Sequence, residues 1–99
     1  ASFGIFHGEP VRVRIWFAPE VAGYVSEKTW HATQHIETLK DGAILFEAEV
    51  AGTTEIKYWI MGWGSRAVVL SPDSLHSEIL AESEALLENY AQIPDRLKA

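Results

Sequence analysis

The sequence has no cysteine, few basic residues and no long apolar run, and each absence narrows what the chain can be. Without cysteine there is neither a disulfide framework nor a thiolate metal site, so a reducing cytoplasm is the expected location. No segment approaches the ~20 apolar residues needed to span a bilayer, and the start lacks the charged region of a secretion signal. Eight basic residues against 14 acidic ones give a net charge of −6, which argues against general duplex-DNA binding.

What the 99 residues do contain is largely apolar. The hydrophobic share is 47% and includes four tryptophans and four phenylalanines, enough to bury one modest core in a single domain. The chain begins without methionine, in an apolar and aromatic stretch. We therefore expect further sequence upstream, and we interpret residues 1–10 as a linker from a missing domain and residues 11–90 as the domain itself.

The first half of the domain predicts a strand, a helix and a hairpin. Residues 11–17 alternate apolar and polar side chains, as a half-buried strand does. Pro19 suits the first turn of a helix that continues to about Trp30, although Ala18 offers it no side-chain cap. Extended runs at 33–40 and 43–50 flank Asp41-Gly42, a strong hairpin signal.

The second half predicts a helix, a strand and a closing helix. A helix capped by Thr53 or Thr54 carries one apolar stripe and ends at Gly64; the stripe is Ile56, Trp59, Ile60 and Trp63. A short strand at 66–70 follows. The last helix has Ser71 as its cap and Pro72 at its first position, and we expect it to end near Tyr90, leaving 91–99 as a frayed tail broken at Pro94. Its inner edge is Leu75, Ile79, Leu86 and Tyr90.

The order βαββαβ is that of the ferredoxin-like α+β fold. It predicts a four-stranded antiparallel sheet with two helices on one face, plus the C-terminal helix. In this topology the 11–17 strand lies beside the 43–50 strand. The other face of the sheet stays open, and it is the first place to look for function.

The open face should carry alternating residues of the two central strands. These are Arg12, Arg14 and Trp16 from one strand and Leu45, Glu47 and Glu49 from the other. Arginines facing glutamates across an antiparallel pair stabilise a sheet by roughly 0.2–1 kcal/mol each, so they can be structural partners only. Trp16 on an uncovered face instead indicates a surface that meets a ligand or partner. We take Arg12, Arg14, Trp16, Glu47 and Glu49 as candidate surface residues.

The sequence gives little support for a catalytic site or a metal site. His31 and His35 are four residues apart, but an extended chain separates such residues by ~13 Å, too far for one metal ion. Hydrolase motifs are absent, and the loop of residues 18–20 has no arginine where acylphosphatases of this topology have one. We expect neither a cofactor nor a metal, and no enzyme activity. The acidic last helix is either a solvated face or a docking surface for a basic partner.

Several segments together resemble one family, the WCX C-terminal extension of WYL-domain bacterial helix-turn-helix transcription regulators. Residues 3–14 (FGIFHGEPVRVR) resemble the junction between the WYL domain and this extension. The later matching segments, in order, are PEVA at 19–22, WHATQ at 30–34, VAG at 50–52, Glu55 with Ile56, WIMGWG at 59–64 and VLSP at 69–72. Two mild departures are Ala32, where the family often has proline, and Trp63, where phenylalanine is common.

The resemblance implies a regulatory, ligand-sensing or dimerisation module. Its partners would be a WYL domain and a DNA-binding winged helix of the same protein, both outside this chain, in a homodimer that touches DNA only indirectly. A small molecule or a nucleic acid would be the effector. Two alternatives stay open: an ACT-like domain that binds a metabolite through Arg12 or Arg14, and single-stranded nucleic acid stacking on Trp16.

Overall fold

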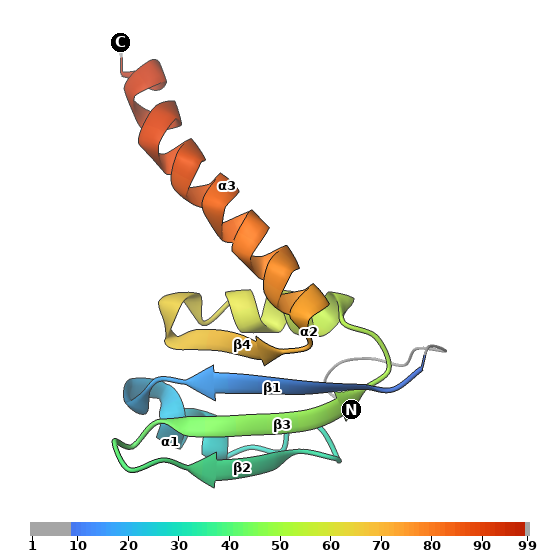
Figure 1. Cartoon of the computed structure of the whole chain (residues 1–99). Helices are drawn as coiled ribbons and strands as arrows, with labels where there is room; N and C mark the ends of the chain where they lie inside the picture. The colour runs from blue at the N-terminus through green and yellow to red at the C-terminus, as the bar shows by residue number, and fades with distance from the viewer. Residues whose placement is uncertain (1–8, 99) are drawn as a thin grey trace.

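The computed structural model describes residues 9–98 and confirms the α+β, ferredoxin-like architecture (Figure 1). Its strands are β1 (Val11–Phe17), β2 (His35–Thr38), β3 (Ile44–Val50) and β4 (Ala67–Ser71). Its helices are α1 (Pro19–Ser26), α2 (Thr54–Met61), the 3-10 turn η1 (Gly64–Arg66) and α3 (Asp73–Leu97). The N-terminal linker that we predicted falls, except for Glu9 and Pro10, outside the described residues.

The four strands form one antiparallel sheet in the order β2-β3-β1-β4. The hairpin inserts β3 between β2 and β1, as the sequence predicts. The conformation of its turn accounts for the Asp41-Gly42 pair. Gly42 has a φ of +91°, which is costly for any residue with a Cβ, and the Asp41 carboxylate accepts a hydrogen bond of 3.0 Å from the Ala43 amide. This turn sets the register of β2 against β3.

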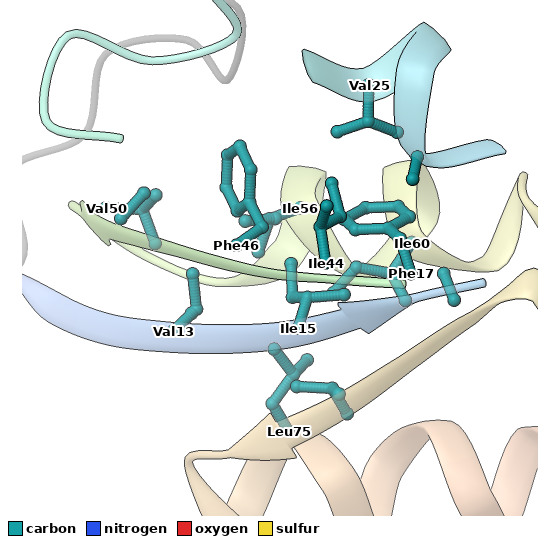
Figure 2. Close-up of a cluster of buried hydrophobic side chains, with 14 residues drawn as sticks. Val13, Ile15, Phe17, Val25, Ile44, Phe46, Val50, Ile56, Ile60 and Leu75 are labelled. Atoms are coloured by element: carbon teal, nitrogen blue, oxygen red, sulfur yellow. The ribbon is translucent and has the colours of Figure 1, made fainter. Parts of the chain in front are cut away.

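One face of the sheet and all three helices share a single core (Figure 2). Alternate residues of β1 and β3 point into it, which places the intervening residues on the outer face. The fully buried side chains include Ile15, Phe17 and Phe46 from the sheet, Val25 from α1, Ile56 and Ile60 from α2, and Leu75 from α3. Among the described residues no polar side chain is buried. The core therefore stabilises the fold and contributes no polar group to a candidate site.

Helix α1 ends at Ser26, four residues earlier than we predicted. The chain instead turns back so that the Trp30 indole donates a hydrogen bond of 2.8 Å to the Val25 carbonyl. The Gln34 carboxamide then accepts from the amides of Trp30 and His31, at 2.6 and 3.1 Å, and donates to the Lys28 carbonyl. A side chain thus satisfies backbone groups that a longer helix would have paired.

Other boundaries differ by smaller amounts. The predicted runs at 33–40, 43–50 and 66–70 are shortened or shifted to the observed bounds of β2, β3 and β4. Helix α2 ends at Met61 and not at Gly64, whose φ of +64° opens the η1 turn. Thr53 is at the N-cap of α2, but its side chain makes no capping hydrogen bond.

Helix α3 differs most from the prediction. Pro72 is its N-cap and Ser71 still belongs to β4, so Ser71 is not the cap. The helix also runs through Pro94 to Leu97, so an end near Tyr90 with a frayed tail is wrong. Proline removes one backbone donor, and on an exposed helix water can satisfy the freed carbonyl. At 25 residues, α3 is ~37 Å long and projects beyond α2 and β4 (Figure 1).

Length does not make α3 a membrane segment. Within residues 9–98, no helix combines enough length with enough apolar character to cross a bilayer.

Candidate interaction surface on the open sheet face

The outer face of the sheet has a charged half and an apolar half. In the charged half, the register places Arg12 opposite Glu49 and Arg14 opposite Glu47, so the arginines and glutamates are cross-strand partners. Arg14 Nε donates to Glu47 Oε1 at 2.7 Å, and Arg12 meets Glu47 and Glu49 at 3.4 Å each. Glu47 is therefore the centre of a ladder of two arginines and two glutamates.

The ladder carries no uncompensated charge. Both guanidinium groups face carboxylates, and the two positive and two negative side chains balance. A hollow of about 460 Å³ lies beside them, lined also by Thr33 and His35. An anionic ligand entering here would have to displace Glu47 or Glu49 from an arginine, so the ladder favours the structural interpretation of these four residues.

The apolar half surrounds Trp16, which is half-buried. Trp16 lies opposite Leu45 of β3 on one side and Val68 of β4 on the other. A bulge in β4 places both Leu70 and Ser71 opposite Arg14. Val68 and Leu70 are 43% and 42% exposed. Trp16, Leu45, Val68 and Leu70 form an apolar patch, which we call the Trp16 patch.

Sequence reasoning missed the contribution of β4 to this patch. The signal was the alternation of buried Ala67 and Val69 with exposed Val68 and Leu70, which the short run from 66 to 70 already contains. From the sequence we predict that run only as a short strand and assign its residues to neither face. With β4 next to β1, its outward residues necessarily join Trp16.

Two of the described histidines, His31 and His35, lie in the turn before β2 and at its start. His31 lies in the turn before β2, where its Nδ1 is 2.8 Å from the Thr33 hydroxyl, and His35 is the first residue of β2. Residues 9–98 contain no group of three His, Cys, Asp or Glu side chains arranged to hold an ion. In the first turn of α1, Glu20 meets Arg66 of η1 at 3.5 Å.

The turn before β2 has a structural function that the sequence did not reveal. Trp30 packs against Trp59 and Trp63, with ring centroids 5.2 and 6.2 Å apart, and Trp59 also contacts Phe17 and Phe46. Gln34 fixes the backbone around Trp30. The tryptophans thus tie the turn to α2 and to the inner face of the sheet, which leaves Trp16 as the tryptophan of the outer face.

Comparison with family models matches residues 9–87 to the WCX domain. The chain belongs to the WCX domain family. A comparison with curated proteins finds no match. The aromatic cluster and the Gln34 turn account physically for two of the segments on which the resemblance rested, 30–34 and 59–64. In this WCX domain those segments maintain the fold.

Proposed function

We propose that this WCX domain is a non-catalytic regulatory module of a WYL-type bacterial transcription regulator in the cytoplasm. It couples an effector or a neighbouring domain to DNA binding by a winged helix-turn-helix elsewhere in the same protein, within a homodimer. Family membership over residues 9–87 carries the proposal. The domain's own net charge of −6 fits an indirect role, because a direct DNA contact would work against that field.

The Trp16 patch is the surface through which the coupling acts. A large aromatic flanked by three aliphatic side chains on an uncovered sheet face has the composition of an interface centre. The adjoining ladder of arginines and glutamates supplies a polar rim that is already internally paired. Such a surface suits another protein domain better than a small anion.

The two alternatives have less support. An ACT-like metabolite site would need Arg12 or Arg14 to exchange a glutamate for the ligand. Single-stranded nucleic acid would need further stacking aromatics, but the facing positions of β3 are Leu45, Glu47 and Glu49, of which two repel phosphate.

The test uses the full-length regulator that contains this domain. Trp16→Ala should change operator affinity, measured by fluorescence anisotropy, by about tenfold or more, the effect expected of removing a tryptophan anchor from an interface. Tyr24→Ala is the control, because Tyr24 is an exposed aromatic on α1 and not on the outer sheet face. Thermal unfolding of each variant checks that the fold is kept.

If Trp16→Ala and Tyr24→Ala both bind the operator like the unmodified regulator, the outer sheet face does not couple to DNA binding. A thermal-shift screen with metabolites and labelled oligonucleotides on the 99-residue chain separates the alternatives. A stabilising metabolite that Arg14→Ala abolishes would favour the ACT-like function over the one proposed.

A further inference from the structure

Helix α3 carries large apolar side chains after Ile79 that do not belong to the core of the described domain. Leu75 is fully buried and Ile79 packs against the core, but the apolar residues that follow are exposed. Those most exposed are Leu80 (51%), Leu86 (53%), Leu87 (71%), Tyr90 (73%) and Leu97 (76%). Figure 1 shows this part of α3 extending away from β4 and α2. A run of exposed leucines on one element marks an interaction surface.

The projecting part of α3 would also be only marginally stable as an isolated helix. Residues 84–97 form ~21 Å of helix without tertiary support, a length that is marginal for an isolated helix in water. Pro94 within it removes a backbone hydrogen bond and weakens it further. Packing of the apolar side against a partner is the ordinary way such a helix is stabilised.

The apolar side has coiled-coil spacing. Residues at alternating steps of four and three occupy one seam: Ile79, Ser83, Leu86, Tyr90, Ile93 and Leu97. Leu80 and Leu87 widen the seam along one edge. Two hollows follow it, one of about 480 Å³ between the first half of α3 and β4, and one of about 350 Å³ along the second half. Leu86 lines both, so the groove is continuous.

Charge indicates what fills this groove. The acidic residues Glu78, Glu84, Glu88 and Asp95 lie at heptad positions away from the seam. The edge opposite Leu80 and Leu87 carries Glu82, Asn89 and Arg96, spaced by seven residues with opposite charges at its two ends. This edge is negative at one end, neutral at the centre and positive at the other. Two copies placed antiparallel are therefore complementary in charge, because the negative end of each faces the positive end of the other.

We propose that α3 pairs antiparallel with α3 of a second copy of this chain, centred near residue 88. In that register Leu86 meets Tyr90 of the second copy, Ser83 meets Ile93, and Ile79 meets Leu97. Leu87 faces its own equivalent on one edge. On the other edge Glu82 faces Arg96 twice, with the two Asn89 side chains between the pairs.

The same arrangement fills the groove. The last turns of the second helix lie along the first half of α3, where the 480 Å³ hollow is lined by His76, Ile79 and Ser83. A parallel arrangement leaves that hollow open and sets Glu82 beside Leu87, so that no ion pair forms. The match of residues 9–87 ends before Tyr90, Ile93 and Leu97, so the pairing concerns residues beyond the family match.

Sedimentation equilibrium of the 99-residue chain tests the pairing and needs no other domain, so its outcome is independent of the regulator's DNA binding. We expect the mass of two chains. Glu82→Arg alone and Arg96→Glu alone should each weaken dimerisation by about tenfold, because each sets like charges face to face. The double variant Glu82→Arg with Arg96→Glu should restore it, and Glu84→Arg, on the far face, is the matched control.

A second readout uses the absence of native cysteine. Asn89→Cys should link two chains through a short bismaleimide, whereas Glu84→Cys should not. A chain that stays monomeric at high micromolar concentration overturns the proposal and leaves another domain as the partner of α3. A dimer that ignores the charge exchange, or in which both cysteines link equally, overturns the antiparallel register.

Discussion

At the scale of single residues, Glu47 explains the organisation of the charged sheet face. Its two carboxylate oxygens each accept from a different arginine, and its side chain is 26% exposed where that of Arg12 is 61% exposed. The contact with Arg14 is short, at 2.7 Å, whereas both contacts of Arg12 are 3.4 Å. The four residues are therefore unequal, and Arg14 with Glu47 is the dominant pair.

A double-mutant cycle should detect this difference. We expect a coupling free energy of about 0.5–1 kcal/mol between Arg14→Ala and Glu47→Ala, and about 0.2 kcal/mol between Arg12→Ala and Glu49→Ala, since solvent screens the more exposed pair. Urea unfolding of the 99-residue chain measures both cycles, and high salt should reduce both. Equal coupling in the two cycles would contradict the assignment of Glu47 and Arg14 as the dominant pair.

At the scale of elements, two glycines should respond oppositely to the same substitution. Gly42→Ala in the hairpin turn should lower the free energy of unfolding by about 1–2 kcal/mol, because its φ of +91° strains any residue with a Cβ. Gly23→Ala within α1 should raise it by about 0.5–1 kcal/mol, because a Cβ there meets nothing within 4 Å and alanine favours helix. Urea unfolding checks both signs. A stabilising Gly42→Ala would mean that the turn can change its conformation freely.

The elements also show what the sequence could and could not predict. The alternation in 11–17 and the Asp41-Gly42 turn predicted β1 and the hairpin, because strand periodicity and turn geometry are local. The ferredoxin-like strand order then placed β1 beside β3, and with it the arginines beside the glutamates. The end of α1 was not predictable in this way, since it depends on Gln34 bonding the backbone of Trp30 and Lys28. The Trp16 patch was half predicted: Trp16 and Leu45 follow from β1 and β3, whereas Val68 and Leu70 require β4 to be placed as their neighbour.

At the scale of the molecule, the chain consists of a packed domain of sheet and helices and a projecting helical segment, the part of α3 after Ile79. The last fully buried residue is Leu75 and the last that packs against the core is Ile79, although α3 continues to Leu97. The two proposed surfaces adjoin, because Val68 of the Trp16 patch also lines the hollow that Leu80 and Leu86 of α3 border.

This division predicts the behaviour of a shortened chain. A chain ending at Glu84 keeps Leu75 and Ile79, so it should unfold cooperatively with nearly the midpoint of the dilute full chain, and it should remain a monomer at every concentration. The 99-residue chain should instead show a midpoint that rises with protein concentration, because dimerisation stabilises only the folded state. A chain ending at Leu97 is the control and should behave like the full chain. Calorimetry over a range of concentrations distinguishes them, and a chain ending at Glu84 that is unfolded would show that the end of α3 belongs to the fold of the domain itself.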